Sequence, residues 1–218
     1  MRRRPNYLFS EGDLRATLES HKEGALKKIA QFDESRLRDN TIEGLEAQLL
    51  EEYLVHPLLL DKGSVQKSVN EVQVDVSGDR NRYIRDRSQP FNVGGYEYKC
   101  AYRYSGDSLL WKLRPSNWSS VLPVGSIEPD AGGRDGVITF TTQAAGEANP
   151  EQMISAIDRE LQTTEQYISW QSNQVDSFNR ALGDSLIAAL KDRFSRIESA
   201  AKTGVRVDFL NELRETRL

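Results

Sequence analysis

The strongest hydrophobic pattern in the chain lies in its last third, from Asn149 to about Ala201. Apolar side chains recur there at every seventh position, namely at Ile154, Leu161, Ile168, Val175, Leu182 and Ala189. A seven-residue repeat keeps one apolar stripe on one side of a helix, and Asn149-Pro150 is a typical helix start. The pattern predicts one long helix, or two helices with a break near residues 171–173.

An apolar stripe on a helix needs a partner, and the sequence leaves two kinds of partner open. The stripe could pair with a second copy of the chain or with an effector protein. It could equally pack on the rest of its own chain, or in a helical hairpin. The candidate interface residues are Ile154, Leu161, Ile168, Val175, Phe178, Leu182 and Leu186.

Two shorter amphipathic helices are predicted near the N-terminus, at about residues 10–30 and 40–55. Asn40 and Glu43 have the spacing of a capping box, which marks the start of the second helix. This helix must end before Pro57, because the residue that precedes a proline is disfavoured in the helical conformation. The charged segment between the two helices is predicted to be a turn.

Strands are predicted between these helices and the last one, over about residues 71–142. Apolar and polar residues alternate along 72–76 and again along 96–104, which is the pattern of half-buried strands. A glycine-containing turn follows the second run, so residues 109–113 are predicted to return as its hairpin partner. Residues 137–141 form the last predicted strand.

These elements together predict an α+β fold, with N-terminal helices, a small and mainly antiparallel sheet, and a long C-terminal helix or helical hairpin. We expect a head over residues 1–146 and a long helical region over residues 147–218. The hydrophobic fraction of 38% is low for a globular protein, which suits a long helix on a modest head.

The net charge of −4 and a sequence pI of about 5.4 do not indicate a general nucleic-acid-binding surface. The net charge of the whole chain does not exclude a local basic patch, such as residues 2–4. No apolar run approaches the roughly 20 residues that span a bilayer, so no membrane association is expected. The single cysteine, Cys100, can form no internal disulfide, and a cytoplasmic location is expected.

Candidate chemistry in the sequence is sparse. The two histidines, His21 and His56, have no cysteine or histidine at ligand spacing, so neither a metal site nor a cofactor is expected. Cys100 lies mid-strand among tyrosines, which favours a buried thiol over a nucleophile.

One set of residues could support catalysis. Asp75 lies on a predicted strand, and Glu97 and Lys99 stand two apart on another strand. Two carboxylates and a lysine in this arrangement are typical of Mg²⁺-dependent nucleases, where the carboxylates hold the metal. The same alternation also fits the solvated face of a sheet, so both interpretations stay open.

Part of the sequence resembles a known family. The resemblance is carried by Ser105-Gly106-Asp107, Leu110-Trp111 and Arg114-Pro115-Ser116, and by Phe178-Asn179 with Leu182 in the helical region. These residues resemble an uncharacterised bacterial family whose full-length members carry a C-terminal restriction-endonuclease-like domain of the PD-(D/E)xK type. The resemblance covers roughly residues 35–200.

The resemblance implies that this chain corresponds to the non-catalytic front part of such a protein, because it ends at Leu218, where the nuclease domain would begin. No catalytic residue is carried over. The expected function is a binding, regulatory or assembly module linked to bacterial defence against foreign DNA, paired as a homodimer or with an effector through its long helix. The alternative is a Mg²⁺-dependent nuclease that uses Asp75, Glu97 and Lys99. The sequence specifies neither the ligand nor the partner.

Overall fold

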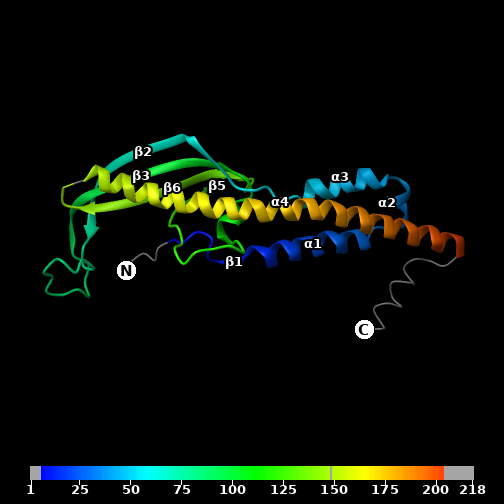
Figure 1. Cartoon of the computed structure of the whole chain (residues 1–218), viewed down its shortest axis with the longest axis horizontal. Coiled ribbons are helices and arrows are strands. Elements are labelled where there is room, and N and C mark those ends of the chain that lie inside the picture. The colour runs from blue at the N-terminus through cyan, green and yellow to red at the C-terminus, as the bar shows by residue number, and fades with distance from the viewer. Residues whose placement is uncertain (1–5, 148, 204–218) are drawn as a thin grey trace. The chain divides into compact units, whose positions relative to one another are not determined.

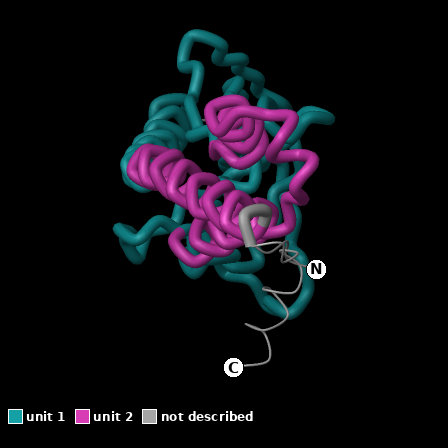
Figure 2. Tube along the Cα trace, turned by 90° about the vertical axis from the view of Figure 1, so that its right-hand side faces the viewer, with its two compact units in different colours: residues 1–14, 56–174 teal, residues 15–55, 175–218 magenta. Residues whose placement is uncertain are grey.

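A computed structural model describes residues 6–147 and 149–203 of the chain (Figure 1). The side chains of residues 201–203 are not part of this description. The chain divides into two compact units (Figure 2). Unit 1 contains residues 1–14 and 56–174, and unit 2 contains residues 15–55 and 175–218.

The centre of unit 1 is a four-stranded antiparallel sheet in the order β2-β3-β6-β5. Its strands are β2 (Leu59–Asp75), β3 (Asn92–Ser105), β5 (Ser126–Pro129) and β6 (Asp135–Ala145). Two short parallel strands, β1 (Gly12–Asp13) and β4 (Leu113–Arg114), form a second sheet beside the 3₁₀ helix η1 (Ser108–Lys112). The long strands β2 and β3 pair as a hairpin that is interrupted by a register shift between Asp61 and Gln66.

The core of unit 1 lies on one face of the sheet. The alternation along β3 turns Tyr98, Cys100, Tyr102 and Tyr104 to this face, where they are buried. The first half of α4 (Pro150–Thr203) lies across the same face (Figure 1).

Tyr167, on this part of α4, fixes the helix to the loops of unit 1. It is fully buried, stacks on Phe9 with ring centroids 5.1 Å apart, and donates a hydrogen bond to the Ser119 carbonyl at 2.7 Å. A buried tyrosine whose hydroxyl is paired contributes both apolar area and a fixed orientation.

Unit 2 is a helical assembly of α1 (Leu14–Ala30), α2 (Glu34–Arg38), α3 (Ile42–Tyr53) and the second half of α4. Asp33 caps α2 and Thr41 caps α3, each accepting a hydrogen bond from a backbone N–H of the first turn. The buried core residues are Ala25, Ile29, Phe32, Leu37, Leu45, Leu49, Leu182, Leu186, Leu190 and Ile197. The buried Arg193 donates to the Phe32 carbonyl through two nitrogens, at 3.1 and 2.8 Å, so its burial is compensated.

The α+β class predicted from the sequence is confirmed, with N-terminal helices, an antiparallel sheet and a long C-terminal helix. The C-terminal stretch is one helix, without a break at residues 171–173. The first helix begins at Leu14 and not near Ser10, because Gly12 and Asp13 pair with β4. The charged segment 33–39, expected to be a turn, contains α2.

One predicted strand pairing was wrong. Residues 109–113 do not return as a strand beside β3; they form most of η1, and β3 pairs with β2 and β6. The compact units also differ from the expected boundary between residues 146 and 147. The reason is that the N-terminal helices and the second half of α4 share one apolar core, so the chain leaves unit 2 at residue 55 and returns to it at 175.

Candidate binding surfaces

The three residues proposed for metal-dependent catalysis are not brought together. Asp75 lies opposite Asn92 in the register of β2 and β3, whereas Glu97 lies opposite Asn70. Five strand positions therefore separate Asp75 from Glu97, or about 17 Å along the strands. One oxygen of Asp75 accepts hydrogen bonds from the backbone N–H groups of Ser77 (2.9 Å) and Phe91 (3.1 Å), so this carboxylate closes the end of the hairpin.

Glu97 and Lys99 belong to the polar face of the sheet. They form an ion pair at 2.7 Å, and Gln143 on β6 donates to the other oxygen of Glu97 at 2.9 Å. The Lys99 ammonium, as the main cause, and the Gln143 amide hold the pKa of Glu97 below its usual value, against the opposing effect of burial. The two residues that lie opposite Lys99 on the neighbouring strands, Ser68 on β2 and Thr141 on β6, are also polar. This arrangement matches the solvated sheet face that the sequence left open.

The apolar stripe of α4 is largely used inside the chain. Val175, Leu182 and Leu186 are fully buried in unit 2, and Phe178 packs partly buried against the same core. On the first half of the helix, Leu161 and Ile168 are half-buried and Ile154 is 42% exposed. The predicted pairing surface is thus mostly covered by residues of the same chain. This is the second possibility that the sequence left open, in which the stripe packs on its own chain.

Cys100 has the structural role expected for a buried thiol. It is 2% exposed, and its contact with the Tyr98 hydroxyl is the main cause that raises the pKa of Tyr98 to about 12, with burial adding to it. The Tyr98 hydroxyl therefore stays neutral at physiological pH.

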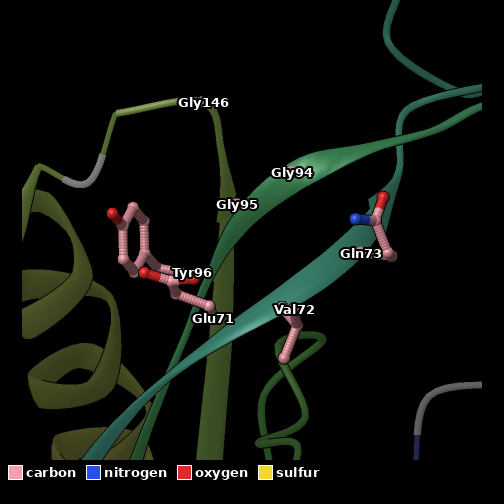
Figure 3. Close-up of a pocket in the computed structure, with 7 residues that line it drawn as sticks. All are labelled: Glu71, Val72, Gln73, Gly94, Gly95, Tyr96 and Gly146. Carbon is pink, nitrogen blue, oxygen red and sulfur yellow. The ribbon is translucent and has the colours of Figure 1, made fainter.

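A shallow hollow of about 460 Å³ lies where the strands β2 and β3 meet the end of β6 (Figure 3). Gly94, Gly95 and Gly146 are among the residues that line it, and the side chains of Glu71 and Tyr96 lie close together at one side of it. A Cβ atom on Gly95 would come within 2.3 Å of the Ala144 carbonyl oxygen, so sheet pairing requires glycine here. The hollow therefore follows from close strand packing, and the sequence reasoning did not foresee it.

The outer edge of β2 is the largest unpaired backbone surface of the sheet. Among the described residues, β2 pairs with β3 only, and its segment 65–71 is almost entirely exposed. Val69 stands at the middle of this segment and is 58% exposed. Lys67 and Glu71 flank it on the same strand face, two positions to either side. An unpaired edge of this length can accept another strand unless it is protected.

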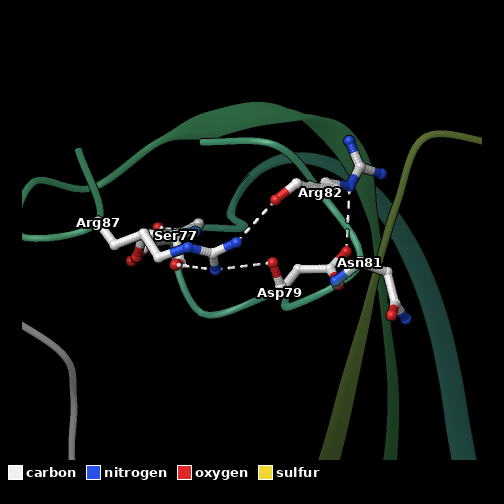
Figure 4. A network of polar contacts seen from close by, with 6 residues as sticks. Ser77, Asp79, Asn81, Arg82 and Arg87 are labelled. Carbon is white, nitrogen blue, oxygen red and sulfur yellow. Dashed lines mark hydrogen bonds and ion pairs between the residues drawn. The ribbon is translucent and has the colours of Figure 1, made fainter. Parts of the chain in front are cut away.

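The tip of the β2–β3 hairpin, residues 76–91, carries four arginines and two aspartates. Figure 4 shows the polar contacts of Arg82, Arg87 and Asp79 in this tip loop. Arg87 holds this tip loop together, because its guanidinium donates to the carbonyls of Ser77 (3.1 Å), Asp79 (2.8 Å) and Arg82 (2.7 Å). Arg82 in turn donates to the Asp79 carboxylate at 3.1 Å. Arg87 thus fixes the backbone of the loop, while Arg82 and Asp79 hold each other as an ion pair.

Several other side chains of the tip loop face the solvent. Tyr83 is 98% exposed, and Arg80 and Arg85 are exposed and make no hydrogen bond or ion pair within the part of the chain that the structure describes. One oxygen of Asp86 accepts hydrogen bonds from the hydroxyl (2.6 Å) and the N–H (2.9 Å) of Ser88, and these bonds lower the pKa of Asp86. Sequence reasoning missed this cluster, although four arginines between residues 80 and 87 were a visible signal.

Within residues 6–147 and 149–203, no helix combines the length and apolar character needed to cross a membrane. Across the same residues, no three His, Cys, Asp or Glu side chains are grouped so that they could hold a metal ion. Comparison of the chain with protein-family models, curated proteins and solved structures finds no match.

Proposed function

We propose that the chain is a non-catalytic assembly and binding module that pairs with a second copy of itself through the free edge of β2. The observation that carries the proposal is the self-complementary pattern of charge along this edge. The sequence hypothesis placed the pairing on α4, but Val175, Leu182 and Leu186 of its stripe are occupied inside unit 2.

The register of the pairing follows from antiparallel geometry. Consider two copies of β2 that pair around a two-fold axis at Val69. A residue that lies a given number of positions before Val69 in one copy then faces the residue that lies the same number of positions after Val69 in the other copy. Lys67 of one copy then lies opposite Glu71 of the other, twice in each dimer, and Val69 meets Val69. On the other strand face Ser68 meets Asn70, so no like charges oppose each other.

Charge also makes this register specific. A lysine on an edge strand discourages unselective pairing, since many registers place it opposite apolar or like-charged residues. The register centred on Val69 places the Lys67 ammonium beside a carboxylate and covers the exposed valine. The pairing would join two four-stranded sheets into one continuous sheet.

A charge-swap experiment tests this proposal. Each opposed charge pair contributes roughly 0.2–1 kcal/mol, and like charges cost a similar amount. We expect Lys67→Glu to weaken the dimer by about tenfold or more, because both symmetric contacts become repulsive. Glu71→Lys should do the same, and the double variant Lys67→Glu/Glu71→Lys should restore the dimer. Sedimentation analysis between about 1 and 100 μM would measure the three equilibria.

A matched control is Lys191→Glu, which reverses an exposed lysine in unit 2 and should leave the equilibrium unchanged. A wild-type chain that stays monomeric over the whole concentration range would refute pairing by β2. A dimer that ignores both single substitutions would place the contact elsewhere.

The cellular setting of the proposal rests on the sequence resemblance. We propose a cytoplasmic module of bacterial defence against foreign DNA, which acts beside a DNA-cutting effector and does not cut DNA itself. The single cysteine supports an intracellular location, and the separation of Asp75 from Glu97 argues against catalysis by those residues. Affinity capture of the tagged chain from its native host should recover a nuclease or another toxic effector if the setting is correct.

A further inference from the structure

We infer that the tip loop of the β2–β3 hairpin, residues 76–91, is a contact site for the phosphate backbone and bases of a nucleic acid, with Arg80, Tyr83 and Arg85 as the contact residues. The inference does not depend on pairing by β2, because the tip loop lies outside the segment 65–73 that would form the dimer.

The first step of the argument is charge. The whole chain is acidic, with a net charge of −4, so its general surface repels a polyanion. Within residues 76–91 the balance is reversed, since four arginines face two aspartates. Asp79 is paired with Arg82, and Asp86 is bound to Ser88. Hydrogen bonds to neutral groups do not cancel a charge, so the loop as a whole keeps an excess of two positive charges. Arg80 and Arg85 are its exposed guanidinium groups that make no hydrogen bond or ion pair among the described residues.

The second step is the positioning of these side chains. Arg87 fixes three carbonyls of the loop (Figure 4). The Val76 N–H donates to the Phe91 carbonyl at 2.9 Å and closes the base of the loop. The loop extends beyond the end of the sheet in Figure 1. A fixed backbone at the end of a two-stranded arm reduces the entropy that binding would cost.

The third step is the chemistry of the exposed groups. A guanidinium matches the geometry of a phosphate through two parallel N–H groups. An exposed tyrosine offers a face on which an unpaired base can stack, whatever its identity. Tyr83 is 98% exposed and stands between the two free arginines in sequence, so stacking and phosphate contacts can occur together.

An anionic lipid surface would also attract arginines, but the loop suits it less well. Membrane-binding basic segments usually combine four to eight positive charges, or a broad apolar face, with anionic lipid. Here two free arginines flank a single exposed ring, and two aspartates lie among them. A nucleic acid is the better match.

The test measures binding of the full chain to a fluorescein-labelled 20-nucleotide single strand and to the corresponding duplex, by anisotropy at several salt concentrations. Wild-type chain should bind at low salt and release as salt rises. Arg80→Gln/Arg85→Gln should weaken binding at least about tenfold at low salt. Loss of two phosphate contacts should also make the slope of log affinity against log salt shallower by about 1.8 for the duplex and about 1.4 for the single strand.

Tyr83→Ala distinguishes the two forms of nucleic acid. If bases stack on the ring, this variant should lose roughly five- to hundredfold in affinity for the single strand and change little for the duplex. An equal small effect on both would assign the site to the backbone of the duplex.

The matched control is Lys27→Gln/Lys191→Gln, which removes the same charge from exposed positions of unit 2 and should leave binding unchanged. The inference is overturned if wild-type chain does not bind either oligonucleotide at about 50 mM salt. It is also overturned if the control weakens binding as much as the arginine variant, or if vesicles containing phosphatidylserine bind through the same arginines while both oligonucleotides do not.

Discussion

Single residues decide what the polar face of the sheet can do, and the pair Glu97–Lys99 shows how. The two side chains are bonded to each other at 2.7 Å, and Gln143 occupies the second carboxylate oxygen. A carboxylate with both oxygens engaged by its own sheet is stabilised in the ionised form. The pair therefore adds to the fold, at a position where a nuclease would need a metal ligand.

The pKa of Glu97 provides a residue-scale prediction. Because Lys99 is the main cause of the lowered pKa, Lys99→Met should raise the pKa of Glu97 toward the ordinary value near 4.5, as measured by NMR titration. In wild-type chain the lowered pKa stabilises the fold above the unfolded-state pKa, and this stabilisation is lost as the pH falls through the folded-state pKa. Lys191→Met should not move the titration. An unchanged pKa in Lys99→Met would show that Gln143 or the sheet backbone sets it.

At the scale of elements, α4 joins two different environments along one apolar stripe. Its first half covers the sheet of unit 1, and its second half completes the helical core of unit 2. Positions on one seven-residue repeat therefore differ in burial, from the fully buried Leu182 to Ile154 at 42% exposed.

This difference predicts unequal costs for two similar substitutions on the same stripe. Leu182→Ala removes a fully buried side chain and should lower the free energy of unfolding of unit 2 by about 2–5 kcal/mol. Ile154→Ala should change stability by about 1 kcal/mol or less, because its side chain is partly solvated already. Urea denaturation followed by circular dichroism would measure both. Equal losses would mean that Ile154 is covered by something that this chain alone does not provide.

The sequence predicted elements better than their partners. The long helix and the alternation of β3 were readable because periodicity records which side of an element is apolar. The return strand at residues 109–113 was wrong because Leu110, Trp111 and Leu113 are all buried, and a short apolar run does not distinguish a strand from a 3₁₀ turn. The four arginines of the tip loop could be read in the sequence, but their division into one that binds backbone carbonyls, Arg87, and two that stay exposed could not, because no spacing reveals such contacts.

At the scale of the whole molecule, the distance between Asp75 and Glu97 argues against a shared metal site for these two carboxylates. Asp75 and Glu97 belong to different parts of the hairpin, and each is engaged in local hydrogen bonds. We expect supercoiled plasmid to stay intact when incubated with the purified chain and Mg²⁺, as followed by gel electrophoresis. Cleavage by wild-type chain that is lost in Glu97→Ala would reverse this conclusion, and cleavage that survives the substitution would point to other residues.

The order in which the chain reaches its units has a consequence for biosynthesis. Neither unit has its complete core until α4 has been made: unit 1 requires residues up to 174, and unit 2 requires Leu190 and Ile197 to cover helices translated near the start. The bond from Arg193 to the Phe32 carbonyl spans 161 positions of sequence. Contacts of such long range form late and slowly. The N-terminal helices therefore leave the ribosome before the α4 residues that cover their apolar sides, and such uncovered apolar surface is prone to aggregate until the last helix emerges.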